Sequence, residues 1–157
     1  MSKFQLKNFF KAAYDLMLVF LQFFIISLHF FQWEFLPKKQ IIQASPFSYS
    51  LGILISIIAF IIMLVSIKAL GRNLSPFPRP INNSNLVTTG IYRFTRHPMY
   101  YSLIFISIGF FIIKLSIYYL FLSISLGLII KFKIALEEQY LQNKFKNYCL
   151  YKNVVKY

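Results

Sequence analysis

The stretch that decides the fold is YSLGILISIIAFIIMLVSI, Tyr49 to Ile67, an uncharged and apolar run. A helix needs about 20 predominantly apolar residues to cross the hydrocarbon core of a bilayer. The run is of that length, so it predicts a transmembrane helix. The whole chain agrees, because 58% of its 157 residues are hydrophobic and only 13% are charged, against about 25% charged in a soluble domain. We therefore expect an integral membrane protein.

Three further apolar runs accompany this one, namely Leu16–Phe31, Met99–Ile113 and Leu115–Ile130. Only Lys114 separates the last two. As one helix they would extend for about 48 Å at 1.5 Å per residue, well beyond a hydrocarbon core of about 30 Å. A helical hairpin that turns near Lys114 fits better. The sequence thus predicts an all-α polytopic membrane protein with about four transmembrane helices, of which the last two form a hairpin.

The charge pattern predicts the orientation. The chain has 17 basic and 4 acidic residues, and they flank the apolar runs, so we expect anionic headgroups rather than nucleic acid as the partner. The N-terminus, the second loop and the tail are strongly basic. The first loop sets Lys38 and Lys39 against Glu34, and the hairpin tip has only Lys114. Because basic segments stay inside, we expect both termini in the cytoplasm, in a bacterial inner membrane.

The loop between the second and third runs is polar and rigid in places. Three prolines in SPFPRP, residues 75–80, favour extended backbone, and we expect Gly90 to supply a positive φ. Pro98 suits the first turn of the third helix. Arg96 and His97 then directly precede a helix N-terminus, whose partial charge and spare N–H groups favour an anion.

The tail, Ile134–Tyr151, has apolar residues at helical spacing and predicts a C-terminal amphipathic helix. Its adjacent Glu137 and Glu138 are half of all the acidic residues. The lone Cys149 excludes an internal disulfide and a cysteine-based zinc site, and we expect no metal.

Each polar residue also has a simpler explanation. Arg93 and Arg96 are ordinary interfacial anchors on this view. His97 is a structural residue, and Glu137 and Glu138 form a solvated helix start. The order and common membrane face of these groups favour a functional site.

LVTTGIYRFTRHPMY, followed by a hairpin and then EEQYLQNKFKNYCLYKNVVKY, resembles the isoprenylcysteine carboxyl methyltransferase family. That group also takes in bacterial phospholipid N-methyltransferase-like proteins. The resemblance covers roughly residues 71–157, and the first two spans match only in kind. We therefore expect a single methyltransferase-like domain over 1–157, with two spans in 1–70 and the cofactor-binding loop, hairpin and tail in 71–157.

The resemblance implies methyl transfer from S-adenosylmethionine at the cytosolic face of the membrane. The implied acceptor is a lipophilic small molecule, lipid-like or prenylated, with a carboxylate, an amine or a thiol, and the enzyme is expected to be a monomer. Carried over by position, the implied catalytic residues are Arg96 and Glu137. The implied cofactor-binding residues are Gly90, Tyr92, His97, Pro98, Tyr100 and Glu138.

The sequence departs from the family pattern at three positions. Ser102 and Lys146 stand where many members have glycine, and Ile91 replaces a proline. These departures keep open a non-catalytic membrane protein with a decayed site. A second alternative is an NADPH-dependent steroid-reductase-like membrane enzyme, because that group shares an RHPxY-type motif. The reductase group commonly has Gly-Glu after its RHPxY-type motif. Here Tyr101 and Ser102 follow, which favours the methyltransferase.

Overall fold

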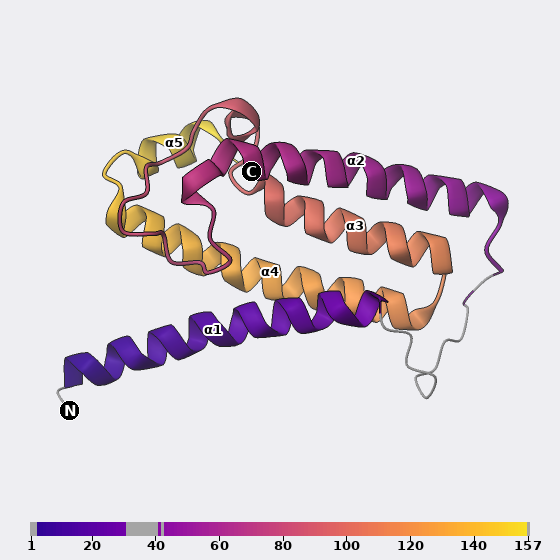
Figure 1. Ribbon diagram of the computed structural model, residues 1–157, viewed down its shortest axis with the longest axis horizontal. Coiled ribbons are helices and arrows are strands. Elements are labelled where there is room, and N and C mark those ends of the chain that lie inside the picture. The colour runs from indigo at the N-terminus through magenta and orange to yellow at the C-terminus, as the bar shows by residue number, and fades with distance from the viewer. Residues whose placement is uncertain (1–2, 31–40, 42, 157) are drawn as a thin grey trace.

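The described residues of the computed structural model, 3–30, 41 and 43–156, form helices and no strands, which confirms the all-α class. Figure 1 shows four long helices and a short C-terminal one. Their bounds are α1 Lys3–Phe30, α2 Pro46–Leu70, α3 Pro98–Lys114, α4 Ile117–Lys144 and α5 Tyr148–Val154. Two 3₁₀ turns, η1 Gly71–Asn73 and η2 Gly90–Arg93, lie in the loop between α2 and α3.

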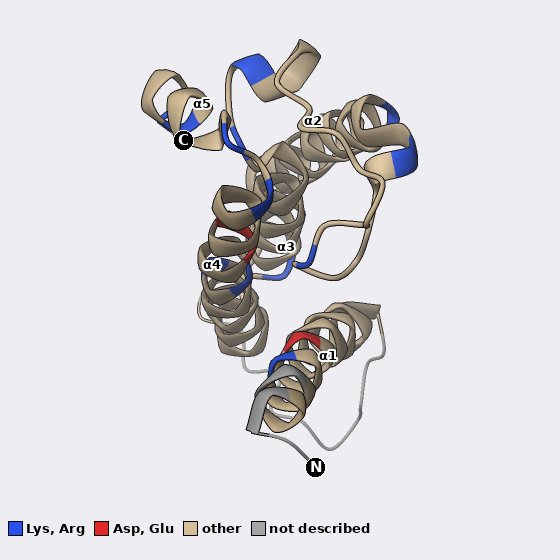
Figure 2. Cartoon of the chain, turned by 90° about the vertical axis from the view of Figure 1, so that its left-hand side faces the viewer, with Lys and Arg blue, Asp and Glu red and all other residues tan. Residues whose placement is uncertain are grey.

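The four long helices run alternately up and down. α2 packs against α3, α3 against α4, and α4 against α1, so α1 is an outer helix (Figure 1). This topology brings the loop of residues 71–97, the end of α4 and α5 to one end of the bundle, which we call the pocket end. Figure 2 looks onto this end and shows Lys and Arg around it. Among the described residues, Lys114 is the only Lys or Arg at the opposite end.

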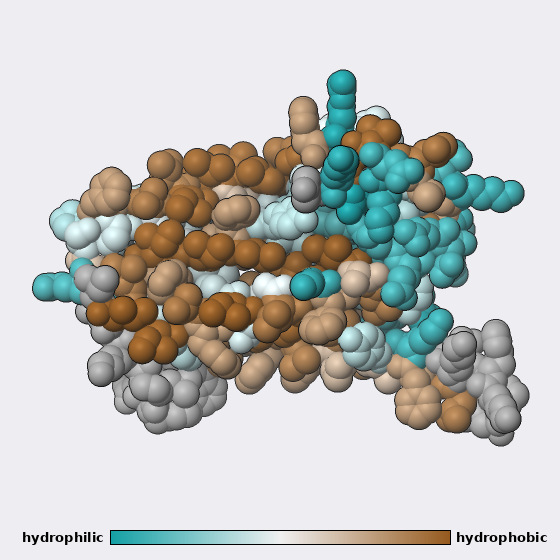
Figure 3. All heavy atoms as spheres, turned by 180° about the vertical axis from the view of Figure 1, so that it is seen from behind, coloured by the Kyte–Doolittle hydropathy of each residue, from teal (hydrophilic) through white to brown (hydrophobic). Residues whose placement is uncertain are grey.

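Three helices are long and apolar enough to cross a membrane: Phe9–Phe30 within α1, Pro46–Asn73, and α4. The shorter α3, with 17 residues, is also apolar. Apolar side chains cover the length of the helices in Figure 3, while hydrophilic ones gather at the pocket end. The chain is thus an integral membrane protein. α3 is the short arm of the hairpin, whereas α4 has 28 residues. Glu34, Lys38 and Lys39, which entered the charge argument, lie outside the described residues.

Local signals explain where the helices begin and end. Ser45 and Ser48 form a capping box in front of α2, with Pro46 at the first helical position, as both residue types favour. Pro98 opens α3 in the same way, as predicted. The hairpin turns at Leu115, whose φ of 43° places it in the left-handed region. The predicted turn near Lys114 is therefore confirmed.

The predicted tail helix over Ile134–Tyr151 has the wrong bounds. α4 continues without a break from Ile117 to Lys144, because no glycine or proline interrupts the chain after Gly127. The interruption comes instead at Phe145, whose extended backbone ends α4 before α5 begins. Glu137 and Glu138 consequently lie in the last third of a long helix, so the interpretation of a solvated helix start is wrong.

Two sets of contacts hold the bundle together away from the pocket. The backbones of α2 and α3 approach closely at Gly52 and Gly109, where an added Cβ on Gly109 would lie 2.1 Å from Ser56 Oγ. Near the C-terminal end of α1, His29 Nε2 lies 2.7 Å from Ser107 Oγ of α3. Ser107 Oγ in turn lies 2.8 Å from Ser123 Oγ of α4. These buried polar contacts fix α1 to the hairpin.

Candidate functional site

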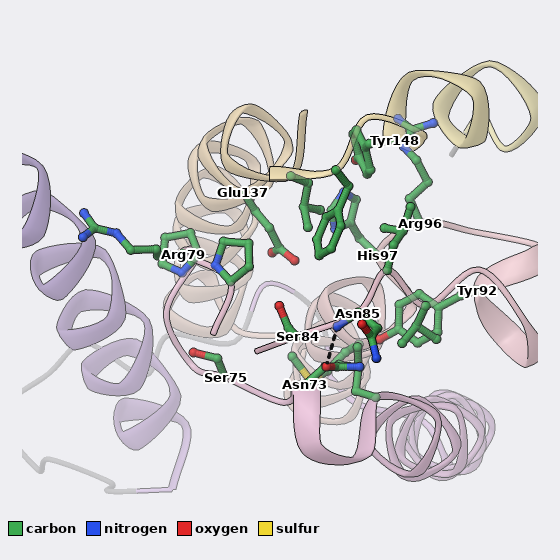
Figure 4. A pocket seen from close by; sticks show the side chains of 18 of the residues that line it. Asn73, Ser75, Arg79, Ser84, Asn85, Tyr92, Arg96, His97, Glu137 and Tyr148 are labelled. Carbon is green, nitrogen blue, oxygen red and sulfur yellow. Dashed lines mark hydrogen bonds between the residues drawn. The ribbon is translucent and has the colours of Figure 1, made fainter. Parts of the chain in front are cut away.

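A pocket opens at the pocket end, between the 71–97 loop, the first turn of α3, the end of α4 and α5 (Figure 4). It holds about 760 Å³ of space between its lining atoms, part of it open to solvent. The lining mixes polar and aromatic side chains, among them Asn73, Ser75, Ser84, Asn85, Tyr92, His97, Tyr100, Glu137, Tyr148 and Tyr151. This lining has a suitable chemistry for a polar organic molecule.

The neighbouring glutamates of α4 have different surroundings. Glu138 is almost buried and faces three basic side chains: its carboxylate lies 2.9 Å from Arg96 Nη2, 2.7 Å from Lys152 Nζ and 3.3 Å from His97 Nε2. Glu137 makes no ion pair with any residue that the structure describes. Its carboxylate points into the middle of the pocket, toward Ser84 (Figure 4). Glu138 is thus held by basic side chains, whereas Glu137 interacts with Tyr100, His97 and Lys133 and lines the pocket.

Arg96 lines the pocket, but its guanidinium turns away from it. It forms hydrogen bonds with Glu138 Oε1 at 2.9 Å and with the carbonyl of Val155, and Figure 4 shows its side chain extending toward α5. The guanidinium therefore fastens the C-terminal segment over the pocket. His97 remains at the wall, with its ring 5.8 Å from the Tyr100 ring.

Arg79 also lines the pocket, yet its guanidinium points toward α1 (Figure 4). It pairs with the buried Asp15 of α1 at 3.2 Å and lies 5.3 Å over the Tyr140 ring of α4. The Tyr140 hydroxyl donates to the same carboxylate at 3.3 Å. This contact ties the proline-rich part of the loop to both α1 and α4.

Three tyrosines form the wall on the α5 side. The Tyr151 hydroxyl donates a 2.6 Å hydrogen bond to the Tyr92 carbonyl, which joins α5 to η2. Burial raises the pKa of Tyr151 to about 12 and raises the pKa of Tyr92 and of Tyr148 further. These phenols therefore stay protonated at physiological pH. They can donate hydrogen bonds or present ring faces, but they are poor general bases.

The structure brings five of the eight predicted site residues to the pocket, namely Tyr92, Arg96, His97, Tyr100 and Glu137. The other three support it from behind. Gly90, with φ 63°, starts η2, Pro98 starts α3, and Glu138 holds the Arg96 and Lys152 side chains. The predicted positive φ of Gly90 is confirmed.

The departures from the family pattern lie outside this lining. Ser102 is buried, and its hydroxyl donates to the Pro98 carbonyl at 2.8 Å. Lys146 is exposed. Sequence reasoning missed the polar residues Asn73, Ser75, Ser84 and Asn85. The only signal was their residue type, which is also common in turns. Asn73 Oδ1 accepts a 3.1 Å hydrogen bond from the backbone N–H of Asn85, which joins two parts of the loop.

Comparison with known proteins gives one family. A family model described as phospholipid methyltransferase matches residues 47–148, more than half of the chain. The match contains α2, the loop, α3, α4 and the first residue of α5, while α1 lies before it. Comparison with curated protein sequences gives no match.

Proposed function

The chain belongs to the phospholipid methyltransferase family and is a membrane methyltransferase, and from this premise we propose that it transfers a methyl group from S-adenosylmethionine to a lipid-like acceptor. The observation that carries the proposal is the orientation of Glu137. The Glu137 carboxylate, which has no ion-pair partner among the described residues, faces a pocket rich in tyrosine, beside a glutamate that pairs with Arg96 and Lys152. Such a wall favours a cationic ligand.

The pocket residues fit the chemistry of the donor. Carboxylates and aromatic faces attract cations, so Glu137, Tyr92 and Tyr100 would hold the ammonium and sulfonium end. The His97 side chain does not cap α3. The N–H groups of Met99 and Tyr100, at the start of that helix, are therefore available for a carboxylate. The side chains of Asn73, Ser84 and Asn85 suit the polar edge of a nucleoside.

The bound donor supplies an electrophilic methyl group, and the chain supplies position. Holding two reactants in line converts a bimolecular step into an effectively unimolecular one, which can account for most of the rate. A carboxylate acceptor needs no base. An amine or thiol acceptor must lose a proton, and His97 and Glu137 are the groups at the wall that can accept it. Arg96 acts through Glu138 and the C-terminal segment on this proposal, as a positioning residue.

The acceptor is proposed to be lipophilic, because the pocket lies at the end of membrane-spanning helices. The basic pocket end would face the cytoplasm of a bacterial inner membrane, with both termini on that side. An acceptor at that depth would have its apolar tail in the bilayer and its nucleophile at the headgroups.

Two measurements test the proposal. First, thermal shifts of the purified protein in detergent should show stabilisation by S-adenosylhomocysteine but not by NADPH. The reverse result would favour the reductase alternative. Second, incubation with radiolabelled S-adenosylmethionine and a membrane extract should move label into the organic phase. If label stays aqueous, the lipid acceptor is wrong. If the donor analogue binds but no extract is labelled, the chain is a non-catalytic member.

A further inference from the structure

Lys133 of α4 is a buried ammonium that the proposed reaction does not use. Its residue is 1% exposed, whereas Lys131, on the same helix, is exposed. Lys133 Nζ contacts Gln22 Oε1 of α1, donates to the Pro76 carbonyl at 2.9 Å and lies 5.3 Å over the Tyr100 ring. The ammonium therefore joins α1, the loop and α3 through α4.

A lysine in this place is costly. Taking an ammonium out of water is unfavourable even after the surroundings relax, and a methionine would occupy similar space without that cost. Ionisable side chains inside membrane helices are commonly functional and have defined partners. Packing alone therefore does not explain Lys133.

The partners of Lys133 belong to the pocket wall. Pro76 lies between Ser75 and Phe77, which both line the pocket, and Tyr100 lines it directly. Glu137 follows Lys133 by one helical turn and interacts with it electrostatically. Lys133 itself is not among the lining residues, so it reaches a ligand only through these groups.

We propose that Lys133 is a positioning residue of the methyl-transfer site, because it fixes the positions of Pro76, Tyr100 and Glu137. Its contact with Gln22 would make α1 part of that site. The inference rests on the proposed function. It extends the site beyond the matched family region, since Gln22 lies before residue 47. Asp15, which holds Arg79, connects the same helix to the same loop.

The test is a double-mutant cycle with Lys133→Met and Gln22→Leu. Each single change leaves the other polar group buried with one partner fewer, and should lower the melting temperature. The double change removes both groups, and such replacements are often neutral, so the melting temperature should return toward that of the wild type. If the pair were merely structural, the double variant would regain affinity for S-adenosylhomocysteine together with its melting temperature. If Lys133 is a positioning residue, affinity should stay at least about tenfold weaker, as for the loss of a charge-assisted hydrogen bond.

Two further variants complete the design. Lys131→Met, an exposed lysine on the same helix, should leave both readouts unchanged. Lys133→Arg keeps the charge and should bind S-adenosylhomocysteine more tightly than Lys133→Met does. If the double variant does not fold, this comparison of the two single variants tests the inference. Wild-type affinity in the double variant, or equal weakening in the Arg and Met variants, overturns the inference. Failure of the wild-type protein to bind the ligand at all would instead count against the proposed function.

Discussion

At the scale of single residues, the two adjacent glutamates of α4, Glu137 and Glu138, have different surroundings. Glu138 faces Arg96, Lys152 and His97, whereas Glu137 faces the pocket. A substitution that removes only the charge should therefore separate binding from stability.

Glu137→Gln should weaken S-adenosylhomocysteine binding roughly 10- to 150-fold, because it removes one charge-assisted contact, with little change in melting temperature. Glu138→Gln is the matched control. It leaves Arg96 without its ion-pair partner in a nearly buried site, which costs on the order of 3 kcal/mol, so its melting temperature should fall first. Calorimetric titration measures the affinity for S-adenosylhomocysteine, and thermal unfolding in detergent measures the melting temperature. If the two variants behaved alike, the division of roles would be wrong.

The sequence identified both glutamates, and the family resemblance implied a cofactor-binding role for Glu138, whereas in the structure its carboxylate pairs with Arg96 and Lys152. Residues adjacent on a helix differ in direction by about 100° at 3.6 residues per turn. Which of them faces the loop depends on how α4 is rotated against α3, and no local pattern specifies that rotation. Asn73 and Asn85 were missed for a related reason, since a turn-forming residue and a pocket residue look the same in sequence.

At the scale of helices, the contact between α2 and α3 depends on small residues. An added Cβ on Gly109 would lie 2.1 Å from Ser56 Oγ and 2.9 Å from the Gly52 carbonyl oxygen, whereas one on Gly127 would meet nothing within 4 Å. Gly109→Ala should therefore cost about 1–3 kcal/mol by overpacking and lower the melting temperature. Gly127→Ala, the control, should be neutral or slightly stabilising. Equal melting temperatures for the two variants would mean that the helices do not pack this closely.

The short helix α5 is joined to η2 by the Tyr151 hydroxyl, which donates to the Tyr92 carbonyl at 2.6 Å. Tyr151→Phe keeps the ring and removes this hydrogen bond, at a cost of about 1 kcal/mol. Amide hydrogen exchange should speed up in both joined segments and stay unchanged in α2. Tyr49→Phe, an exposed position on α2, serves as the control. Unchanged exchange in Tyr151→Phe would show that α5 is held by its other contacts alone.

Long apolar runs specify the spans, so the helices and their hairpin could be predicted from local composition. The tail could not, because amphipathic spacing continues smoothly from the spanning part of α4 and carries no boundary signal before Phe145. The contacts of α1 with the site were also out of reach. Gln22 and Lys133 lie 111 positions apart, and their pairing depends on the order of helices in the bundle.

At the scale of the whole molecule, the basic pocket end should lie in the cytoplasm. The exposed Cys149 reports on that end, and Gln43→Cys, in front of α2, reports on the opposite end. An impermeant thiol reagent applied to intact cells should label Gln43→Cys and leave Cys149 unmodified until the membrane is opened. Labelling of Cys149 from outside would reverse the orientation.

The 17 residues of α3 also affect the surrounding bilayer. At 1.5 Å per residue they rise about 26 Å, several ångströms less than a typical hydrocarbon thickness of about 30 Å. Lipid accommodates such a mismatch by local thinning, or the helix end sinks beneath the interface. Either response brings the first turn of α3, and with it His97 and Tyr100, closer to the acyl chains. The turnover rate should then depend on membrane thickness, and it should differ between vesicles of short-chain and long-chain lipids that have the same headgroup.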